Sequence, residues 1–417
     1  MATTPPTTNR TPLAGVLTLT FLASLGTGGV TNGVFFLTES AFGYGRSLNY
    51  WLALFMGVTY IAAALGAGRV VRFAGRRHAR LNARTMIGIA LGAVGLVCML
   101  PSLATFATGE PQAWTIWVLV AVFSPATGVL WPLVEAYLSG GRRGGELRRA
   151  IGRFNLTWGF ALVVVFWAMA PLVEGRPLTV LVALGVVHLA GIGLLVLFPS
   201  VPGAHSDEHH EPEIDPARAK RLLFVFRTLM PVTYLVLATL SPFFPEAAQS
   251  LGVAPAWRTP LVSIWMIARL GVFGVLGRWH GWHGSWWMPG LGWVSLIAGF
   301  AACVFGPRLG GDAGVWAFAG GLAATGIGMS AIYVGSLYYG MEAGSAHVDA
   351  GGTHESLVGA GYAIGPACGL GALWMTSGSE ASFERVLVTI VVVVCVTISV
   401  GGLGALRAGR GVRRAGP

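Results

Sequence analysis

The chain has 417 residues, of which 54% are hydrophobic and only 11% are charged. Soluble domains carry about 25% charged residues, so this composition excludes an ordinary water-soluble protein and indicates a membrane protein with small polar loops. The net charge of +10 comes from arginines in short loops between apolar segments. The positive-inside rule explains this pattern, and we therefore expect no nucleic-acid partner.

Twelve apolar segments follow one another along the chain, each long enough to cross a bilayer at about 20 residues per crossing. They must be helices, because open strands leave backbone groups unsatisfied in lipid. Residues 1–12 are rich in Thr and Pro and are predicted to be disordered. We expect an all-α membrane protein with twelve transmembrane helices at about 13–38, 48–68, 85–106, 113–137, 152–172, 177–198, 221–244, 258–277, 286–305, 314–340, 355–376 and 384–406.

The stretch 66–84, GAGRVVRFAGRRHARLNAR, contains six arginines and no acid. Short arginine-rich loops resist translocation, so this loop is predicted to be cytoplasmic. Both chain termini are then cytoplasmic as well. Most of the 27 lysines and arginines fall in cytoplasmic segments under this orientation, which supports the number of twelve spans.

Residues 199–220 are polar and contain prolines, which predicts a flexible cytoplasmic linker. It separates two six-helix halves, 13–198 and 221–406, and a basic cytoplasmic tail follows at 407–417. The halves resemble each other in sequence, since Phe35-Phe36 recurs as Phe243-Phe244 and Val134-Glu135-Ala136 recurs as Met341-Glu342-Ala343. Such a repeat predicts two pseudo-symmetric halves.

Gly68, followed by Gly75-Arg76-Arg77, resembles the loop between helices 2 and 3 of the major facilitator superfamily. The layout of six helices, a central loop and six helices resembles that superfamily over nearly the whole chain. The family has an Asp where this chain has Arg72, so the family's helix-capping carboxylate is not carried over. The resemblance implies the major facilitator fold and a place in the cytoplasmic (inner) membrane of a bacterium.

Six residues separate Glu135 from Arg142. This spacing resembles the Glu-x6-Arg element at the cytoplasmic end of helix 4 in sugar porters and other facilitators. The resemblance implies that Glu135 pairs with Arg69 and Arg76 and closes the cytoplasmic side. A proton site and simple solvation at the helix end are the alternatives. The predicted gating residues, including the second copy of these elements, are Arg69, Arg72, Arg76, Glu135, Arg142, Arg278 and Glu342.

Arg269 lies about twelve residues into the eighth predicted span. A cation at that depth costs at least about 2.5–3.5 kcal/mol, so it must face a cavity or a partner. One reading is a binding group for a substrate with an anionic group, which arginine can hold bidentately. The other is a buried structural arginine. The absence of an acid at mid-depth in the other predicted spans favours the substrate reading.

Trp265 lies four residues before Arg269 and therefore on the same helical face. Helix 5 opposes helix 8 in the superfamily, and helices 1, 4, 7 and 10 line its cavity. Ordinary packing or an interfacial aromatic belt is the alternative for each aromatic residue. The predicted substrate-binding residues are Arg269, Trp265, Asn32, Trp131, Asn155, Trp158, Tyr338 and Tyr339.

The loop between helices 10 and 11 is predicted to hold His347, Asp349, His354 and Glu355, with Thr353 and Glu355 capping helix 11. Metal binding there is the alternative, and we expect no metal site. Phosphate-loop, GxSxG and HExxH motifs are absent, so we expect no enzyme, no catalytic residues and no cofactor.

These features predict a secondary active transporter that works by alternating access on a small organic molecule, with an anionic group as one option. Proton-coupled efflux is the first hypothesis and uptake of a metabolite or sugar the second. A membrane receptor or assembly factor that keeps the fold without transporting is a third, which Arg72 favours. The expected partners are the small-molecule substrate, the lipid bilayer and protons, and the expected state is a monomer.

Overall fold

The computed structural model describes residues 10–78, 80–142, 144–203, 215–279, 281–342, 348–376 and 380–414. In these residues all regular structure is helical. Twelve helices or runs of consecutive helices in this part of the chain are long and apolar enough to cross a membrane. The prediction of an all-α, twelve-span, multi-pass membrane protein is confirmed.

The first six spans are built from the N-terminal helices, which we define as α1–α7. Their bounds are α1 Leu13–Gly26, a π-helical segment Thr27–Asn32, α2 Val34–Phe42, α3 Arg46–Arg77, α4 Ala83–Thr108, α5 Trp114–Ser139, α6 Gly144–Met169 and α7 Pro177–Ile192, followed by a 3₁₀ turn Gly193–Leu197.

The last six spans are built from the C-terminal helices, which we define as α8–α15. Their bounds are α8 Pro216–Leu240, a 3₁₀ turn Ser241–Phe243, α9 Phe244–Ser250, α10 Pro255–Val262, α11 Ile264–Leu276, α12 Trp287–Phe305, a 3₁₀ turn Gly306–Leu309, α13 Gly311–Glu342, α14 Val348–Thr376 and α15 Glu380–Arg414.

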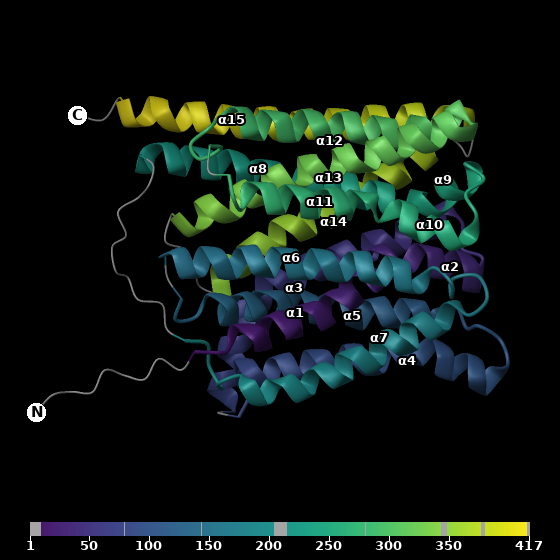
Figure 1. Cartoon of the computed structure of the whole chain (residues 1–417), viewed down its shortest axis with the longest axis horizontal. Coiled ribbons are helices and arrows are strands. Elements are labelled where there is room, and N and C mark those ends of the chain that lie inside the picture. Colours follow the sequence, from purple (N-terminus) through teal and green to yellow (C-terminus); the bar gives the residue numbers. More distant parts are fainter. Residues whose placement is uncertain are drawn as a thin grey trace, which may run out of the picture.

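Figure 1 shows the long helices running roughly side by side, with most N-terminal helices on one side of the bundle and most C-terminal helices on the other. The two groups meet where α3 packs along α14, α5 contacts α14, and α6 packs on α11. The start of α1, the end of α3 and the end of α15 lie at one end of the bundle, which we call the basic end (Figure 1). The start of α3 lies at the other end, which we call the opposite end.

The contact between α3 and α14 depends on glycine. A Cβ atom built on Gly57 of α3 would lie 2.3 Å from the backbone oxygen of Tyr362 on α14. A Cβ on Gly359 of α14 would lie 3.0 Å from Ile61 Cβ on α3. Lipid gives no hydrophobic drive between helices, so close backbone packing of this kind is what holds membrane helices together.

Several helix boundaries differ from the prediction. The basic stretch predicted as a loop stays helical to Arg77, and α14 begins at Val348, so it includes His354 and Glu355. A helix can continue beyond the hydrocarbon layer because its backbone hydrogen bonds are internal, and hydropathy alone cannot register such an extension. Residues 407–414 continue α15. The predicted linker falls partly on 204–214, and the predicted disordered start on 1–9, both of which lie outside the described residues.

Substituting Gly57 tests the α3–α14 contact. We expect Gly57→Ala to lower the melting temperature of the detergent-solubilised protein, because overpacking typically costs about 1–3 kcal/mol. Gly66→Ala is the matched control on the same helix, since its new Cβ would meet only Val70, at 4.0 Å. Equal melting temperatures for the two variants in a thermal-unfolding assay contradict the close contact.

Candidate functional site

A cavity lies between the N-terminal and C-terminal helices. Its lining alternates aromatic rings with polar groups, an arrangement suited to a partly apolar organic ligand. The aromatic and polar lining residues come from both groups of helices and include Asn32, Tyr60, Trp131, Glu135, Trp158, Tyr234, Trp265, Arg269, Tyr333, Glu355 and Tyr362.

Arg269 of α11 is only 1% exposed and lies in a cage of aromatic rings. The guanidinium carbon is 4.7 Å from the ring centre of Trp158 and 4.9 Å from that of Tyr333. Phe273 and Tyr234 complete the cage at 5.4 and 5.8 Å. Each such cation–π contact contributes about 2 kcal/mol when it is desolvated, so the rings replace part of the hydration that the cation lost.

The hydrogen-bonding capacity of Arg269 is only partly used. One guanidinium nitrogen donates to the Tyr234 hydroxyl at 3.3 Å, while the buried Nε has no partner. Within the described residues, no carboxylate lies in ion-pair distance of Arg269. A buried cation in this state is poised to accept an anionic ligand, because a ligand oxygen can take the donors that the protein leaves unused.

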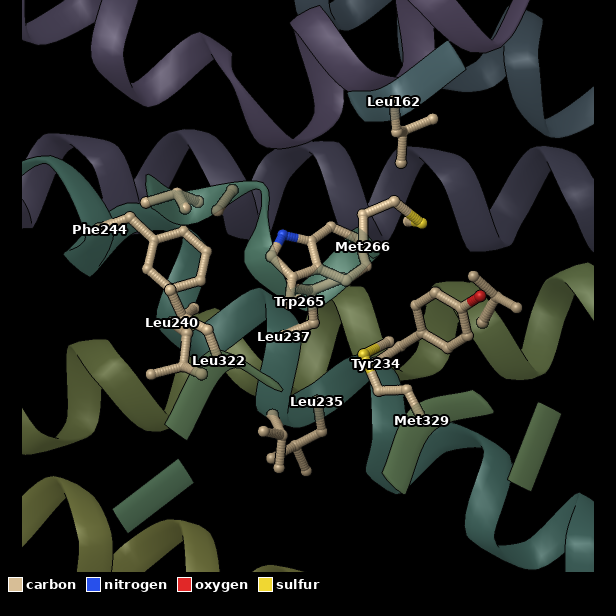
Figure 2. Packing of buried hydrophobic residues seen from close by; sticks show 14 of the residues in the cluster. Leu162, Tyr234, Leu235, Leu237, Leu240, Phe244, Trp265, Met266, Leu322 and Met329 are labelled. Atoms are coloured by element: carbon tan, nitrogen blue, oxygen red, sulfur yellow. The ribbon is translucent and has the colours of Figure 1, made fainter. Parts of the chain in front are cut away.

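Three further polar atoms in the cavity wall are buried without a partner, namely Ser24 Oγ, Asn32 Oδ1 and Trp265 Nε1. Trp265 packs among Leu237, Met266 and Leu240 in the apolar part of the wall, as Figure 2 shows. Asn32 ends the π-helical segment of the first span, where the Gly33 N–H bonds to the Gly28 oxygen five residues back. Such wide turns occur frequently at functional sites.

The cavity also contains a group of acidic residues towards the basic end. Glu135 of α5 and Glu355 of α14 approach each other together with His354, and their candidate ligand atoms all lie within 4.8 Å of one another. The Tyr60 hydroxyl on α3 donates to Glu355 Oε2. Such a set of groups can bind either a metal ion or a proton.

Sequence reasoning does not identify Glu355 as a cavity residue, because it places this residue in the loop before helix 11. It does not identify Tyr60 either, because this residue lies in the predicted span 48–68, which the resemblance does not place among the cavity-lining helices. A detectable signal was present in the sequence. Glycines recur along 351–369, at positions 351, 352, 359, 361, 365 and 369, which is the pattern of a helix packed closely on its neighbours. A helix that contains Glu355 within such a pattern carries an acid into the protein interior.

Five of the eight predicted substrate-binding residues line this cavity, namely Arg269, Trp265, Asn32, Trp131 and Trp158. Asn155 and Tyr338 instead line a second cavity between α6, α11 and α13, although Asn155 Oδ1 accepts a hydrogen bond from Trp158 Nε1 at 3.2 Å. Tyr339 lines neither described cavity, since its ring stacks on Phe226 and its hydroxyl accepts from the Gly284 N–H at 2.8 Å.

The predicted pairing of Glu135 with Arg69 and Arg76 is absent from the described ion pairs. Both arginines are exposed on the last turns of α3, whereas Glu135 faces α14 across the cavity. Arg72 is exposed on the same turns, and Arg278 is exposed and donates to the Gly274 oxygen at 3.1 Å. Glu342 is the last residue of α13, and its side chain lies outside the described part.

Arg142, the last of the predicted gating residues, is 4% exposed and bonds to backbone rather than to an acid. It donates to the oxygens of Leu138 at 2.7 Å and of Thr11 at 2.5 Å. Burial lowers the pKa of Arg142, with the charge of Arg10 adding to this effect and that of Glu146 opposing it. In this conformation Arg142 therefore satisfies a backbone carbonyl group at the end of α5 and links that end to the segment before α1.

At the opposite end, ion pairs join the N-terminal helices to the C-terminal helices. Arg46 at the start of α3 pairs with Glu246 of α9, and its guanidinium also lies 4.1 Å from the ring centre of Phe383. Arg258 of α10 lies 3.9 Å from Glu174, which follows α6. Nearby, burial raises the pKa of Glu39, and the charge of Arg258 opposes that rise. These contacts hold the opposite end together.

Breaking the Arg46–Glu246 pair should loosen the opposite end. We expect Arg46→Glu to increase the rate at which a maleimide labels a cysteine introduced at Ser241, a residue that lines the adjoining cavity between the two groups of helices. The swapped double variant Arg46→Glu/Glu246→Arg should restore slow labelling, because it restores the opposite charges. Fast labelling in both, or in neither, contradicts the role of the pair. The native cysteines are buried and give the background in the parent protein.

No protein-family model and no curated protein sequence matches the chain. Solved structures do match. The nucleoside transporter NupG in its D323A mutant form has a TM-score of 0.64 and 13% identity over 95% of this chain and 99% of that chain. Another structure of NupG gives a TM-score of 0.61 and 13% identity over 94% and 98%.

A structure described as giving structural insights into substrate recognition in proton dependent oligopeptide transporters has a TM-score of 0.65 and 12% identity. It covers 95% of this chain and 98% of that chain. At these identities the similarity concerns the fold, and it extends over nearly the whole length of both chains. The chain therefore shares the overall fold of these transporter structures, and the part that the structure describes contains twelve helical segments long and apolar enough to cross a membrane.

Proposed function

We propose that this protein is a secondary transporter that moves a small organic molecule with an anionic group across the cytoplasmic membrane by alternating access. The observation that carries the proposal is Arg269. It is fully buried in the cavity wall, is held by aromatic rings, and keeps an unused donor. A structural arginine would be expected to have a carboxylate partner or a full set of carbonyl partners, because an incompletely satisfied buried cation is costly.

The cavity wall indicates more of the ligand's chemistry. Arg269 Nε and Trp265 Nε1 need an acceptor, and Asn32 Oδ1 needs a donor. Trp131 and Trp158 supply faces on which a flat or apolar part of the ligand packs. Nucleosides and oligopeptides, which the matched transporters are named for, combine hydrogen-bonding groups with flat or apolar parts, and they support a small organic substrate. Of the two, only peptides also carry a carboxylate group of the kind that Arg269 would bind.

The mechanism follows from the contacts between the two groups of helices. The ion pairs of Arg46 and Arg258 hold the opposite end, and the α5–α14 contact holds the basic end, which is predicted to face the cytoplasm. Partly exposed ion pairs contribute only about 0–1 kcal/mol each, so they can break without a large cost. Rocking of the two halves about the cavity would open one end as the other closes. We propose export as the direction of transport, and uptake of a metabolite or sugar is the alternative.

A receptor or assembly factor with the same fold is the alternative from another class. The observation that favours it is Arg72, which replaces the aspartate of the family's loop. Substrate-dependent flux in proteoliposomes separates the two, since a receptor binds its ligand without moving it.

Removing the charge of Arg269 tests the anion site. We expect a panel of small anions, neutral sugars and lipophilic cations to include an anion that raises the melting temperature of the purified wild type. A ligand at 100 times its Kd stabilises by about 2.7 kcal/mol. Arg269→Met keeps an unbranched apolar side chain in the aromatic cage and should abolish that response.

Arg221→Met is the matched control, because Arg221 donates to its own helix at the Ala217 oxygen and lies away from the cavity lining. It should respond as the wild type does. If the wild type responds to neutral or cationic compounds alone, or if Arg269→Met keeps the anion response, the anion-binding role of Arg269 is wrong.

A further inference from the structure

Two carboxyl groups from different halves of the chain meet inside the protein. Glu135 comes from α5 and Glu355 from α14, and with His354 they bring their ligand atoms within 4.8 Å of one another. The approach is direct, since a Cβ built on Gly351 of α14 would lie 2.8 Å from Glu135 Oε2. Glu355 is 9% exposed. This pair is separate from the cage around Arg269, which holds the proposed anion site.

The surroundings do not neutralise the pair with a fixed cation. Within the described residues, neither carboxylate has an arginine or lysine in ion-pair distance. His354 Nε2 is buried and has no hydrogen-bond partner, so the histidine adds an unused polar atom to the same group. Two carboxylates that share one site repel each other, and the repulsion is relieved when they hold one proton between them.

The other titratable or charged groups that face the pair are hydroxyls and distant cations. Tyr60 on α3 donates to Glu355 Oε2 and is a neutral donor. Arg227 on α8 and Arg269 on α11 are near enough for their charges to act on His354. The tyrosines that line the cavity with the pair are Tyr234 on α8, Tyr333 on α13 and Tyr362 on α14. None of these groups neutralises the two carboxylates, so a mobile cation remains as their neutralising partner.

We propose that Glu135 and Glu355 form a proton-binding site that exists only while α5 and α14 are in contact. Opening of the basic end would separate the two helices, place the carboxylates apart and release the proton on that side. A proton that binds one conformation better than another shifts the equilibrium between them, and this is the physical requirement for proton coupling. The inference rests on the proposed transport function and adds the driving ion and its two ligands.

The direction of coupling follows from the position of the pair. The site is assembled when the basic end is closed and is lost when that end opens. If the basic end faces the cytoplasm, a proton taken up from the outer side is released inside. Substrate that binds at Arg269 after this release moves outwards, so the geometry favours exchange of an inward proton for an outward organic anion.

The test measures the distance between α5 and α14 as a function of pH, without any substrate. Spin labels on Ser139→Cys of α5 and Thr353→Cys of α14 report the contact in proteoliposomes. In the otherwise wild-type chain we expect the short distance to dominate at low pH and a longer one to grow as the pH rises. One linked proton changes the ratio of the two populations by up to about tenfold per pH unit.

Glu355→Gln and Glu135→Gln each remove one charge but keep the size and hydrogen-bonding capacity of the side chain. Both should hold the short distance across about pH 5 to 9, since the repulsion is gone. Glu146→Gln is the matched control, because Glu146 lies at the basic end, is exposed and pairs with Arg10. It should keep the pH dependence of the parent protein.

Three results overturn the proposal. They are a distance in the parent protein that does not depend on pH, a pH dependence that survives in both glutamine variants, and a distance that responds to Zn²⁺ or Mn²⁺ at fixed pH while protons have no effect. The last result assigns the group to a metal instead. A pH-dependent distance in a protein that shows no anion response in the thermal panel supports the proton site while removing the proposed substrate, so the two hypotheses fail separately.

Discussion

Burying ionisable groups at the depth of a bilayer is the constraint on which the rest of this structure depends. Arg269, Glu135 and Glu355 all lie on membrane-spanning helices, where exposure to lipid would cost several kcal/mol for each charge. The chain places all three in one internal cavity between its two groups of helices. Within the described residues, Arg269 nevertheless forms no ion pair with either acid, so the opposite charges in the cavity do not neutralise each other directly.

The three charged groups are stabilised in different ways. Aromatic faces surround Arg269, which keeps its charge without using all of its donors. The two acids instead face each other, and a tyrosine hydroxyl satisfies one oxygen of Glu355. In the function that we propose, an anion completes the surroundings of Arg269 and a proton completes those of the two acids.

Close packing at glycine connects the cavity to the proposed rocking motion. Gly57 and Gly359 bring α3 and α14 together, and that contact places Tyr60 beside Glu355. Gly351 similarly lets Glu135 of α5 lie against α14. The same helices that form the contact between the halves therefore carry the acids, so a separation of the halves necessarily changes the environment of those acids.

The sequence by itself determined the number of spans and the burial of Arg269 away from lipid, because hydropathy and the cost of a buried cation are local properties that one segment reveals. It also indicated the aromatic cavity residues Trp158 and Trp265, through helical spacing and the order of helices in the fold that it resembles. Tertiary structure alone decided that Glu135 faces Glu355 and not Arg69 or Arg76, and that Tyr339 packs on Phe226 away from the cavity. These outcomes depend on the rotation and close approach of helices far apart in the chain, which are set by packing between backbones and not by the composition of any one helix.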